Sequence, residues 1–118
     1  MLAKKFRLSG EKEFKKIYNR GRYIPGSFVG IKYLLTEKQR NRETQEKSEA
    51  PKIAIVVSKK INNKATVRNK IKRQIGESIY SVIDKIPASI EMIVITKRFS
   101  DDFTSLKEDV IGCLRKIM

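Results

Sequence analysis

The chain has 118 residues, of which 40% are hydrophobic, 34% are charged and one is cysteine, a size and composition that fit one domain with one modest core. Its 27 Lys and Arg against 13 Asp and Glu give a formal charge of +14, which favours nucleic acid or an anionic membrane as partner. The sequence has no apolar run of the roughly 20 residues that cross a membrane, no apolar signal stretch at its start and no second cysteine for an internal disulfide, so we expect a soluble, cytoplasmic protein without a membrane partner.

The first half of the chain predicts one helix and two strands. A helix is expected over residues 11–20, ended by Gly21. Its apolar positions, three to four residues apart, are Phe14, Ile17 and Tyr18. Residues 27–35 and 53–58 are rich in β-branched, aromatic and other apolar side chains and predict strands. Residues 36–50, between the two strands, have almost no apolar side chains, so we predict a mobile hairpin loop there.

A longer helix is predicted from about residue 64 towards residue 84. Asn62 or Asn63 can cap its start, and Pro87 closes it. The apolar stripe of this helix drifts slowly round its axis. The stripe consists of Val67, Ile71, Ile75, Ile79, Val82 and Ile83.

The last two predicted elements are a strand over residues 90–96 and a helix reached through residues 100–105. The apolar positions of this helix are Phe103, Leu106, Val110, Leu114 and Ile117. Cys113 falls on its packed side and is interpreted as a small core residue. The order α-β-β-α-β-α predicts a single α+β domain over residues 1–118, a sandwich in which helices pack on a small mixed sheet.

The residues argue against autonomous catalysis. The chain has no His, the side chain best suited to proton transfer near neutral pH. The closest carboxylate pairs, Asp101 with Asp102 and Glu108 with Asp109, are adjacent in sequence, and adjacent side chains diverge, so neither pair makes a metal cage. Asp101 and Asp102 are interpreted as acids that complement the dipole at the start of the last helix. We therefore expect no catalytic residues and no metal ligands.

A basic run within the long helix and the segment before it carries the strongest functional signal. Acids are absent from residues 50–76. A solvated helix face is the ordinary meaning of a charge run, but here the positive potentials add within a Debye length of roughly 8 Å without local partners. Nucleic-acid binding is therefore favoured. The cations are Lys59, Lys60, Lys64, Arg68, Lys70, Lys72 and Arg73.

Individual side chains in this run suggest how phosphate could be held. Asn69, Lys70 and Arg73 point away from the apolar stripe of the predicted helix. Arg68 lies close to the edge of the stripe, so its stem can pack while its guanidinium reaches outward. An Arg fork followed by the short polar Asn69 can orient phosphate oxygens, whereas Lys supplies a point charge.

The segment Ala-Thr-Val-Arg-Asn-Lys-Ile-Lys-Arg at residues 65–73 resembles the Arg-Asn-Arg helix signature of the bacterial ribonuclease P protein family. The resemblance covers nearly the whole chain. It also rests on Arg-Leu at residues 7–8, on Phe-Lys-Lys-Ile-Tyr at residues 14–18 followed by Gly21, and on Val-Ser-Lys-Lys at residues 57–60. Two departures concern the helix: Lys70 stands where the signature has its second Arg, and Gly76 stands where another Arg is frequent. Basic residues of the tail, Lys4, Lys5 and Arg7, can compensate.

The resemblance implies a fold with a left-handed strand-helix-strand crossover and a protein subunit that contains no catalytic residues. In the family, the RNA subunit holds the catalytic Mg²⁺ ions and cleaves precursor tRNA endonucleolytically at the mature 5′ end, and the protein alone binds no cofactor. The implied partners are ribonuclease P RNA and precursor tRNA, with the protein as a monomer in the holoenzyme. The implied contacts with the catalytic RNA are Lys59, Lys60, Lys64, Arg68, Asn69, Lys70, Lys72 and Arg73. The 5′ leader would lie in a cleft between the first helix and the sheet, lined by Phe14, Tyr18 and Tyr33.

Two other functions fit the same charge. A structural RNA-binding protein of the ribosomal type would need the basic run but no leader cleft and no processing role. A DNA-binding module would prefer duplex DNA to folded RNA at equal salt, although the sequence contains no helix-turn-helix pair, zinc finger or dimerising heptads to set its register on DNA.

Overall fold

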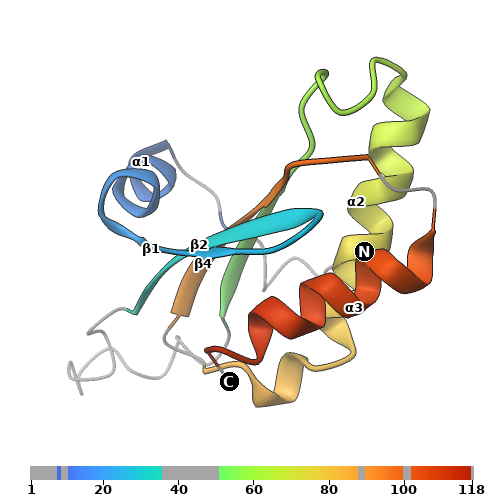
Figure 1. Cartoon of the computed structure of the whole chain (residues 1–118). Coiled ribbons are helices and arrows are strands. Elements are labelled where there is room, and N and C mark those ends of the chain that lie inside the picture. Colours follow the sequence, from blue (N-terminus) through green and yellow to red (C-terminus); the bar gives the residue numbers. More distant parts are fainter. Residues whose placement is uncertain (1–7, 9–10, 36–50, 88–89, 100–101, 118) are drawn as a thin grey trace.

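The computed structural model describes residues 8, 11–35, 51–87, 90–99 and 102–117, which form a four-stranded sheet with helices on both faces (Figure 1). The predicted hairpin loop of residues 36–50 and the basic tail of residues 4–7 lie outside the described part of the chain. The elements are α1 (Glu11–Arg20), β1 (Arg22–Pro25), β2 (Val29–Leu35), β3 (Lys52–Val56), α2 (Ala65–Tyr80), the 3₁₀ turn η4 (Ile83–Lys85), β4 (Ile90–Thr96) and α3 (Phe103–Leu114).

The sheet is mixed, as predicted, with the strand order β1-β2-β4-β3. β2 is antiparallel to both of its neighbours, with Tyr33 opposite Arg22 on β1 and opposite Met92 on β4. β3 runs parallel to β4, with Ile53 opposite Met92. A parallel pair needs a crossover connection, and α2 provides it.

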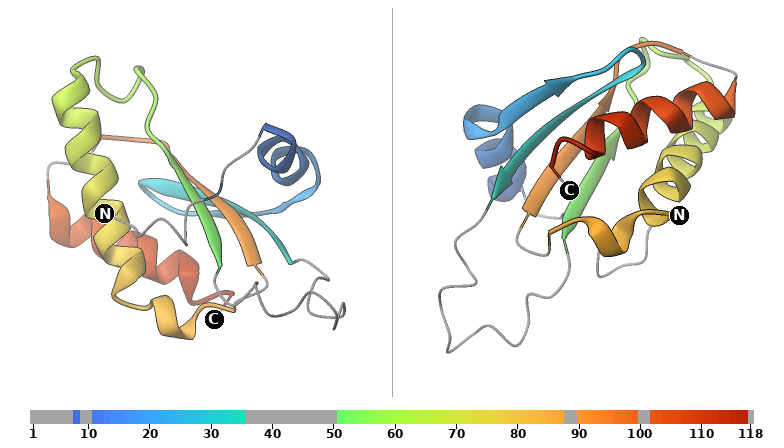
Figure 2. Two further views of the ribbon diagram at one scale, coloured as in Figure 1. Left: turned by 180° about the vertical axis from the view of Figure 1, so that it is seen from behind. Right: turned by 60° about the horizontal axis from the view of Figure 1, so that its bottom comes forward.

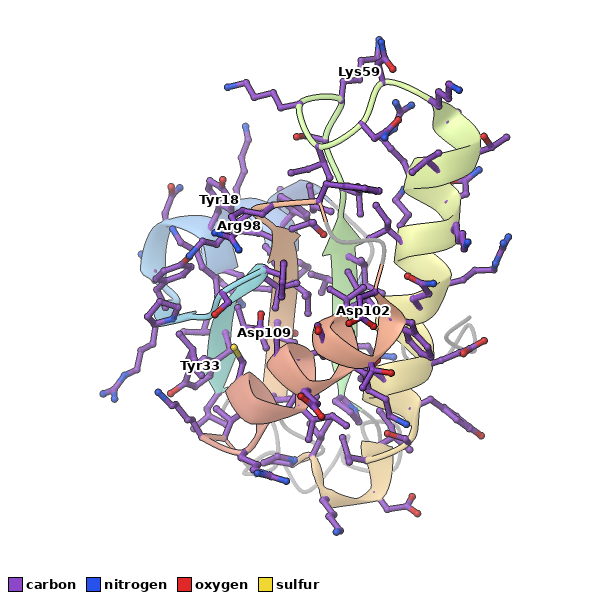
Figure 3. All side chains as sticks on the ribbon, turned by 45° about the vertical axis from the view of Figure 1, so that its right-hand side comes forward. Tyr18, Tyr33, Lys59, Arg98, Asp102 and Asp109 are labelled. Carbon is purple, nitrogen blue, oxygen red and sulfur yellow. The ribbon has the colours of Figure 1, made fainter. Side chains whose placement is uncertain are left out.

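The helices form two layers on opposite sides of the sheet. α1 packs against β2 and β4, whereas α2 packs against β3 and α3 against β2 on the other face (Figures 1 and 2). Seen with α2 and α3 toward the viewer and with β3 and β4 running upward, the chain passes from β3 on the right to β4 on the left (Figure 3). The crossover is therefore left-handed, as the resemblance implied, against the usual right-handed rule.

The main core lies between the sheet and the α2–α3 layer. Ile31, Met92 and Val94 point from the sheet into this core and are completely buried. From the helices it receives Ile71, Ile75, Ile79, Leu106, Val110, Cys113 and Leu114. The burial of Cys113 confirms its interpretation as a core residue. A smaller contact on the opposite face buries Ile17 of α1 and Ile93 of β4 completely.

One strand was missed: β1 adds an element to the predicted α-β-β-α-β-α order. It has four residues, of which only Ile24 is buried, so it shows too little alternation to be recognised from sequence. It begins directly after Gly21, whose N–H donates to Ile17 O at 2.7 Å and ends α1. A Cβ on Gly21 would lie 2.9 Å from Tyr33 O, so the close return of the chain from α1 to the sheet requires glycine at this position.

The long predicted helix is shorter than expected at its C-terminal end. α2 ends at Tyr80, and the Ser81 hydroxyl donates to Ser78 O at 2.7 Å. The backbone of Val82, with φ −124° and ψ 20°, has left the helical conformation, so the apolar residues Val82 and Ile83 reach the core from a 3₁₀ turn and its start rather than from the helix.

The predicted N-cap of α2 is also corrected. The N-cap position is Lys64, and its side chain makes no capping bond. Asn62, two residues before the N-cap, supports the turn that leads into the helix: its Oδ1 accepts a hydrogen bond from Lys64 N at 3.0 Å. Two predicted strands shift slightly, because residues 27–28 precede β2 and residues 57–58 follow β3, while residues 90–96 form β4 as predicted.

Two aspartates fix the ends of elements around α3. Asp102 is the N-cap of α3 and accepts hydrogen bonds from Thr104 N at 3.1 Å and from Ser105 Oγ at 2.8 Å. Asp101, for which the same role at the helix start was predicted, lies outside the described residues. Asp109 of α3, labelled in Figure 3, accepts three backbone N–H bonds from the end of the β1–β2 connection and the first residue of β2. The donors are Ser27 N at 2.8 Å, Phe28 N at 2.8 Å and Val29 N at 3.0 Å.

Candidate nucleic-acid interface

Eight polar and charged side chains at the start of α2 and in the turn before it form the first part of the candidate interface, here called the basic surface. β3 ends at Val56, and a turn closed by a bond from Ile61 N to Ser58 O leads to α2. Lys59 lies at the end of the molecule where α2 begins (Figure 3). The basic surface consists of Lys59, Lys60, Lys64, Arg68, Asn69, Lys70, Lys72 and Arg73.

The packing of α2 holds this surface in a fixed orientation. Ile71, Ile75 and Ile79 are at most 3% exposed and attach the helix to the core. The side chains between them therefore project to solvent on the other faces of the helix. The exposed members of the basic surface are Lys59, Lys60, Lys64, Asn69, Lys70, Lys72 and Arg73.

Arg68 differs from the other cations because it is half-buried. Its Nη1 donates to Asn62 O at 3.1 Å, and this bond joins the first turn of α2 to the segment before it. The guanidinium, expected to reach outward, thus has a structural partner in the protein. A guanidinium carries five N–H groups in a planar fork, so Arg68 can brace the turn and still direct donors toward a phosphate.

The charge of the basic surface is not neutralised locally. Within the described part of the chain, no ion pair is seen for any of its seven cations, whereas Lys16 pairs with Glu13 on α1 at 3.5 Å. α2 has no acid in its first turn, where the positive end of the helix dipole adds to the field. Polyanion binding is what such a surface can do chemically.

The second part of the candidate interface, here called the aromatic surface, consists of Phe14, Tyr18 and Lys32 on the α1 side of the sheet. The rings of Phe14 and Tyr18 are stacked, with centroids 6.0 Å apart and planes 18° apart. Ile17, between them in sequence, points to the sheet and is buried, which leaves Tyr18 47% exposed. A largely exposed tyrosine stacked on a second ring is a platform on which a nucleobase can stack.

Lys32 attaches the aromatic surface to β2. Its Nζ donates to Tyr18 O at 2.7 Å and lies 4.4 Å from the centroid of the Tyr18 ring. The carbonyl of Tyr18 is among the last four of α1, which have no partner within the helix, so the ammonium satisfies this carbonyl and also holds the ring by a cation–π contact. The site thus combines stacking surface with positive charge.

Tyr33 is not brought together with Phe14 and Tyr18. It pairs with Met92 and packs against the main core on the α2–α3 face, whereas Lys32, its neighbour in sequence, points to the α1 face. Alternation along a strand sends successive side chains to opposite faces. The three aromatic residues expected in one cleft are therefore divided between the two sides of the sheet.

Sequence reasoning missed several side chains near these surfaces. Lys32 could have been assigned to the α1 face only from the alternation of side chains along β2. Tyr23 lies in the short strand β1, which was not predicted. Lys97 and Arg98 follow β4 and are exposed at the end of the sheet from which β3 leads to the basic surface. The Arg98 guanidinium lies 5.1 Å from the centroid of the Phe28 ring. In the sequence, Lys97 and Arg98 could have been noticed as a pair of cations directly after a buried strand.

Two further properties bear on the class of protein. Within the described ranges, no three His, Cys, Asp or Glu side chains gather into a group that could hold a metal ion. No helix in that same part of the chain is long and apolar enough to cross a membrane. An uncompensated basic helix on one side of a small mixed sheet and an exposed aromatic pair on the other define a nucleic-acid-binding α+β protein.

Comparison with known proteins narrows this class. The family model described as Ribonuclease P matches residues 2–118. The chain is 32% identical over 116 residues to the ribonuclease P protein component of Listeria welshimeri, covering 97% of this chain and 89% of that protein. It is 28% identical over 107 residues to the ribonuclease P protein component of Nostoc punctiforme, with 81% and 76% of the two chains covered. The chain belongs to the ribonuclease P protein family.

Solved structures support the fold. The ribonuclease P protein of Staphylococcus aureus superimposes with a TM-score of 0.79 at 21% identity, covering 94% of each chain. The ribonuclease P protein of Thermotoga maritima superimposes with a TM-score of 0.76 at 23% identity, covering 95% of this chain and 97% of the other. At these identities the likeness concerns the architecture.

Proposed function

We propose that this chain is the protein subunit of a ribonuclease P ribonucleoprotein and that its two surfaces bind different RNAs. The basic surface binds the catalytic RNA, and the aromatic surface binds the single-stranded 5′ leader of precursor tRNA. The RNA subunit, with Mg²⁺, cleaves the precursor to give the mature 5′ end, and this chain contributes binding and orientation without catalytic residues. The protein works as a monomer in the holoenzyme, in the cytoplasm.

The observation that carries this proposal is the exposure of a stacked aromatic pair on the face opposite the basic helix. Charge alone would serve a structural RNA-binding protein equally well. Packing gives no reason to leave Tyr18 47% exposed beside Phe14 with an ammonium against its ring. Unpaired nucleotides, by contrast, are bound by aromatic stacking together with positive charge.

Reconstitution tests the proposal. The protein is added to a bacterial ribonuclease P RNA at low Mg²⁺, and cleavage of a precursor tRNA is followed, with protein alone and RNA alone as controls. Cleavage only with both components supports the subunit function. RNA binding without any stimulation of cleavage would favour a structural RNA-binding protein, and a preference for duplex DNA would favour the third candidate.

The aromatic surface is tested separately with two substrates. We expect Phe14→Ala and Tyr18→Ala to weaken binding of precursor tRNA with a leader more than binding of mature tRNA, because the mature product has no leader to stack. Circular dichroism and thermal melts of each variant verify the fold. Equal losses on both substrates would point to damage to the protein rather than to a leader contact.

A further inference from the structure

Tyr23 lies on the same side of the sheet as the aromatic surface, although nothing in its local sequence marks it. Its neighbour Ile24 points into the main core, so alternation sends Tyr23 to the α1 face. Tyr23 is directly opposite Lys32 on β2, and side chains in such cross-strand pairs are neighbours, with Cβ atoms roughly 4.5–5.5 Å apart. Lys32 in turn contacts Tyr18.

The Tyr23 ring is seated on a glycine. A Cβ built on Gly30 would lie 2.7 Å from Cε1 and from Cζ of Tyr23, so the ring occupies the space that any other residue at position 30 would fill. Gly30 is the diagonal cross-strand neighbour of Tyr23, since it pairs with Pro25. One side of the ring therefore rests on the backbone of β2 and covers Gly30, which is buried.

The rest of the residue remains open to solvent. Tyr23 is 47% exposed, the same fraction as Tyr18. The cation on its own face is Lys32, directly opposite it, because Arg22 pairs with Tyr33 and points to the other face; the described parts of β1 and β2 contain no acid. An aromatic ring fixed against a sheet, with the ammonium of Lys32 on the same face, has the chemistry that binds a base and its phosphate in single-stranded RNA.

We propose that Tyr23 extends the aromatic surface by one stacking position, so that Phe14 and Tyr18, then Lys32, then Tyr23 contact successive parts of one single-stranded RNA segment. Gly30 is the positioning residue for Tyr23, because its missing side chain allows the ring to lie against β2. Lys32, between the two tyrosines, faces the phosphate that joins the stacked nucleotides. The inference rests on the proposed function, since the occupant is the leader of precursor tRNA.

A purely structural role for Tyr23 is the competing explanation, because aromatic side chains often cover glycines in sheets. The two roles differ in their dependence on leader length. A covering residue affects the stability of the protein and therefore all substrates alike. A stacking residue affects only precursors whose leader is long enough to reach it.

The experiment uses the complex of full-length protein with ribonuclease P RNA, under conditions that suppress cleavage. It measures the dissociation constants of this complex for mature tRNA and for precursor tRNAs with leaders of increasing length. For the wild type, affinity should rise with leader length to a plateau. Tyr23→Ala should lower the plateau by about 5- to 20-fold, equivalent to about 1–2 kcal/mol at 1.4 kcal/mol per tenfold, and leave mature tRNA unaffected. Tyr23→Phe should retain wild-type affinity, because it keeps the ring.

Two further variants make the test specific. Gly30→Ala should displace the ring and reproduce most of the Tyr23→Ala loss on long leaders, yet add nothing in the Tyr23→Ala background. Tyr80→Ala removes a tyrosine of α2 that is 56% exposed and serves as the matched control. A wild-type plateau that Tyr23→Ala leaves unchanged, an equal loss on mature tRNA, or a Tyr23→Phe variant as weak as Tyr23→Ala would each overturn the inference. A wild type indifferent to leader length would instead overturn the proposed function.

Discussion

Asp109 is a single side chain that holds the start of β2 to α3. Its two carboxylate oxygens accept the backbone N–H groups of Ser27, Phe28 and Val29, and so tie α3 to the segment that leads into β2. From sequence, Asp109 was noticed only as a member of an adjacent acid pair. The backbone donors that bind it lie 80 to 82 positions earlier in the chain, a separation across which local patterns carry no information.

We expect Asp109→Ala to destabilise the protein by about 2–4 kcal/mol, because hydrogen bonds to a charged group contribute about 1.5–3 kcal/mol each and are not additive. Urea denaturation monitored by circular dichroism measures the change. Glu108→Ala, which removes an exposed acid from the same helix, is the control and should stay close to wild type. Similar losses in both variants would show that the three backbone bonds contribute little.

Cys113 offers a second prediction for a single residue. Burial raises the pKa of its thiol, and the negative charge of Asp109 raises it further. The thiolate is the reactive form, so alkylation by iodoacetamide at pH 8 should be much slower in the native protein than in the chain unfolded in urea. Mass spectrometry of timed samples gives both rates. Equal rates would mean that the α3 side of the core opens readily.

At the scale of elements, the sequence predicted the three helices, the mixed sheet and strands close to β2, β3 and β4, because each of these has a clear apolar period. It failed for β1, whose four residues bury only Ile24. The missing strand also explains why the candidate site was only partly predicted. Without β1 there is no register for Tyr23, and without the pairing of β2 with β4 the face that Tyr33 occupies cannot be assigned, because a shift of one residue moves a side chain to the opposite face.

The start of α3 gives a prediction about pH. The side-chain hydrogen bond from Ser105 lowers the pKa of the Asp102 carboxyl below its ordinary value, with backbone bonds from Thr104 and Ser105 acting in the same direction and desolvation opposing them. A lowered pKa in the folded state means that the ionised group stabilises the fold above the unfolded-state pKa, about 3.9, and that this contribution is lost as pH falls through the folded-state value.

Asp102→Asn should therefore be less stable than wild type at pH 6, and the difference should shrink as the pH is lowered below about 4. Asn keeps the ability to cap a helix but cannot ionise, so it isolates the contribution of the charge. Urea denaturation of both proteins at matched pH values measures the difference. A gap that stayed constant from pH 6 to pH 2.5 would show that the Asp102 charge does not act on α3.

At the scale of the whole molecule, the sheet separates the basic surface from the aromatic surface. Substitutions on the two surfaces should therefore act independently, because sites without shared partners usually add within about 0.5 kcal/mol. Arg73→Ala should weaken binding of the catalytic RNA and reduce the slope of log affinity against log salt by nearly one unit if it contacts one phosphate. Tyr18→Ala should affect only substrates with a leader.

The double variant, Arg73→Ala with Tyr18→Ala, tests this independence. Its free-energy loss for leader-containing precursor, measured in the complex with the catalytic RNA, should equal the sum of the two single losses. Glu77→Ala, on the same helix and also exposed, controls for removal of any charged side chain from α2. A double variant no weaker than either single variant would mean that the two surfaces form one continuous site.

The two outer strands of the sheet have a consequence for solubility. Exposed strand edges pair with other chains and start aggregation unless they are short, interrupted or covered. β1 is only four residues long and ends in Pro25, which has no N–H to offer a neighbouring strand. At the opposite edge, Leu8 N donates to Ile53 O of β3 at 2.9 Å and occupies part of the free edge. With both borders protected in this way, the protein should remain dispersed at high concentration even before any RNA binds to it.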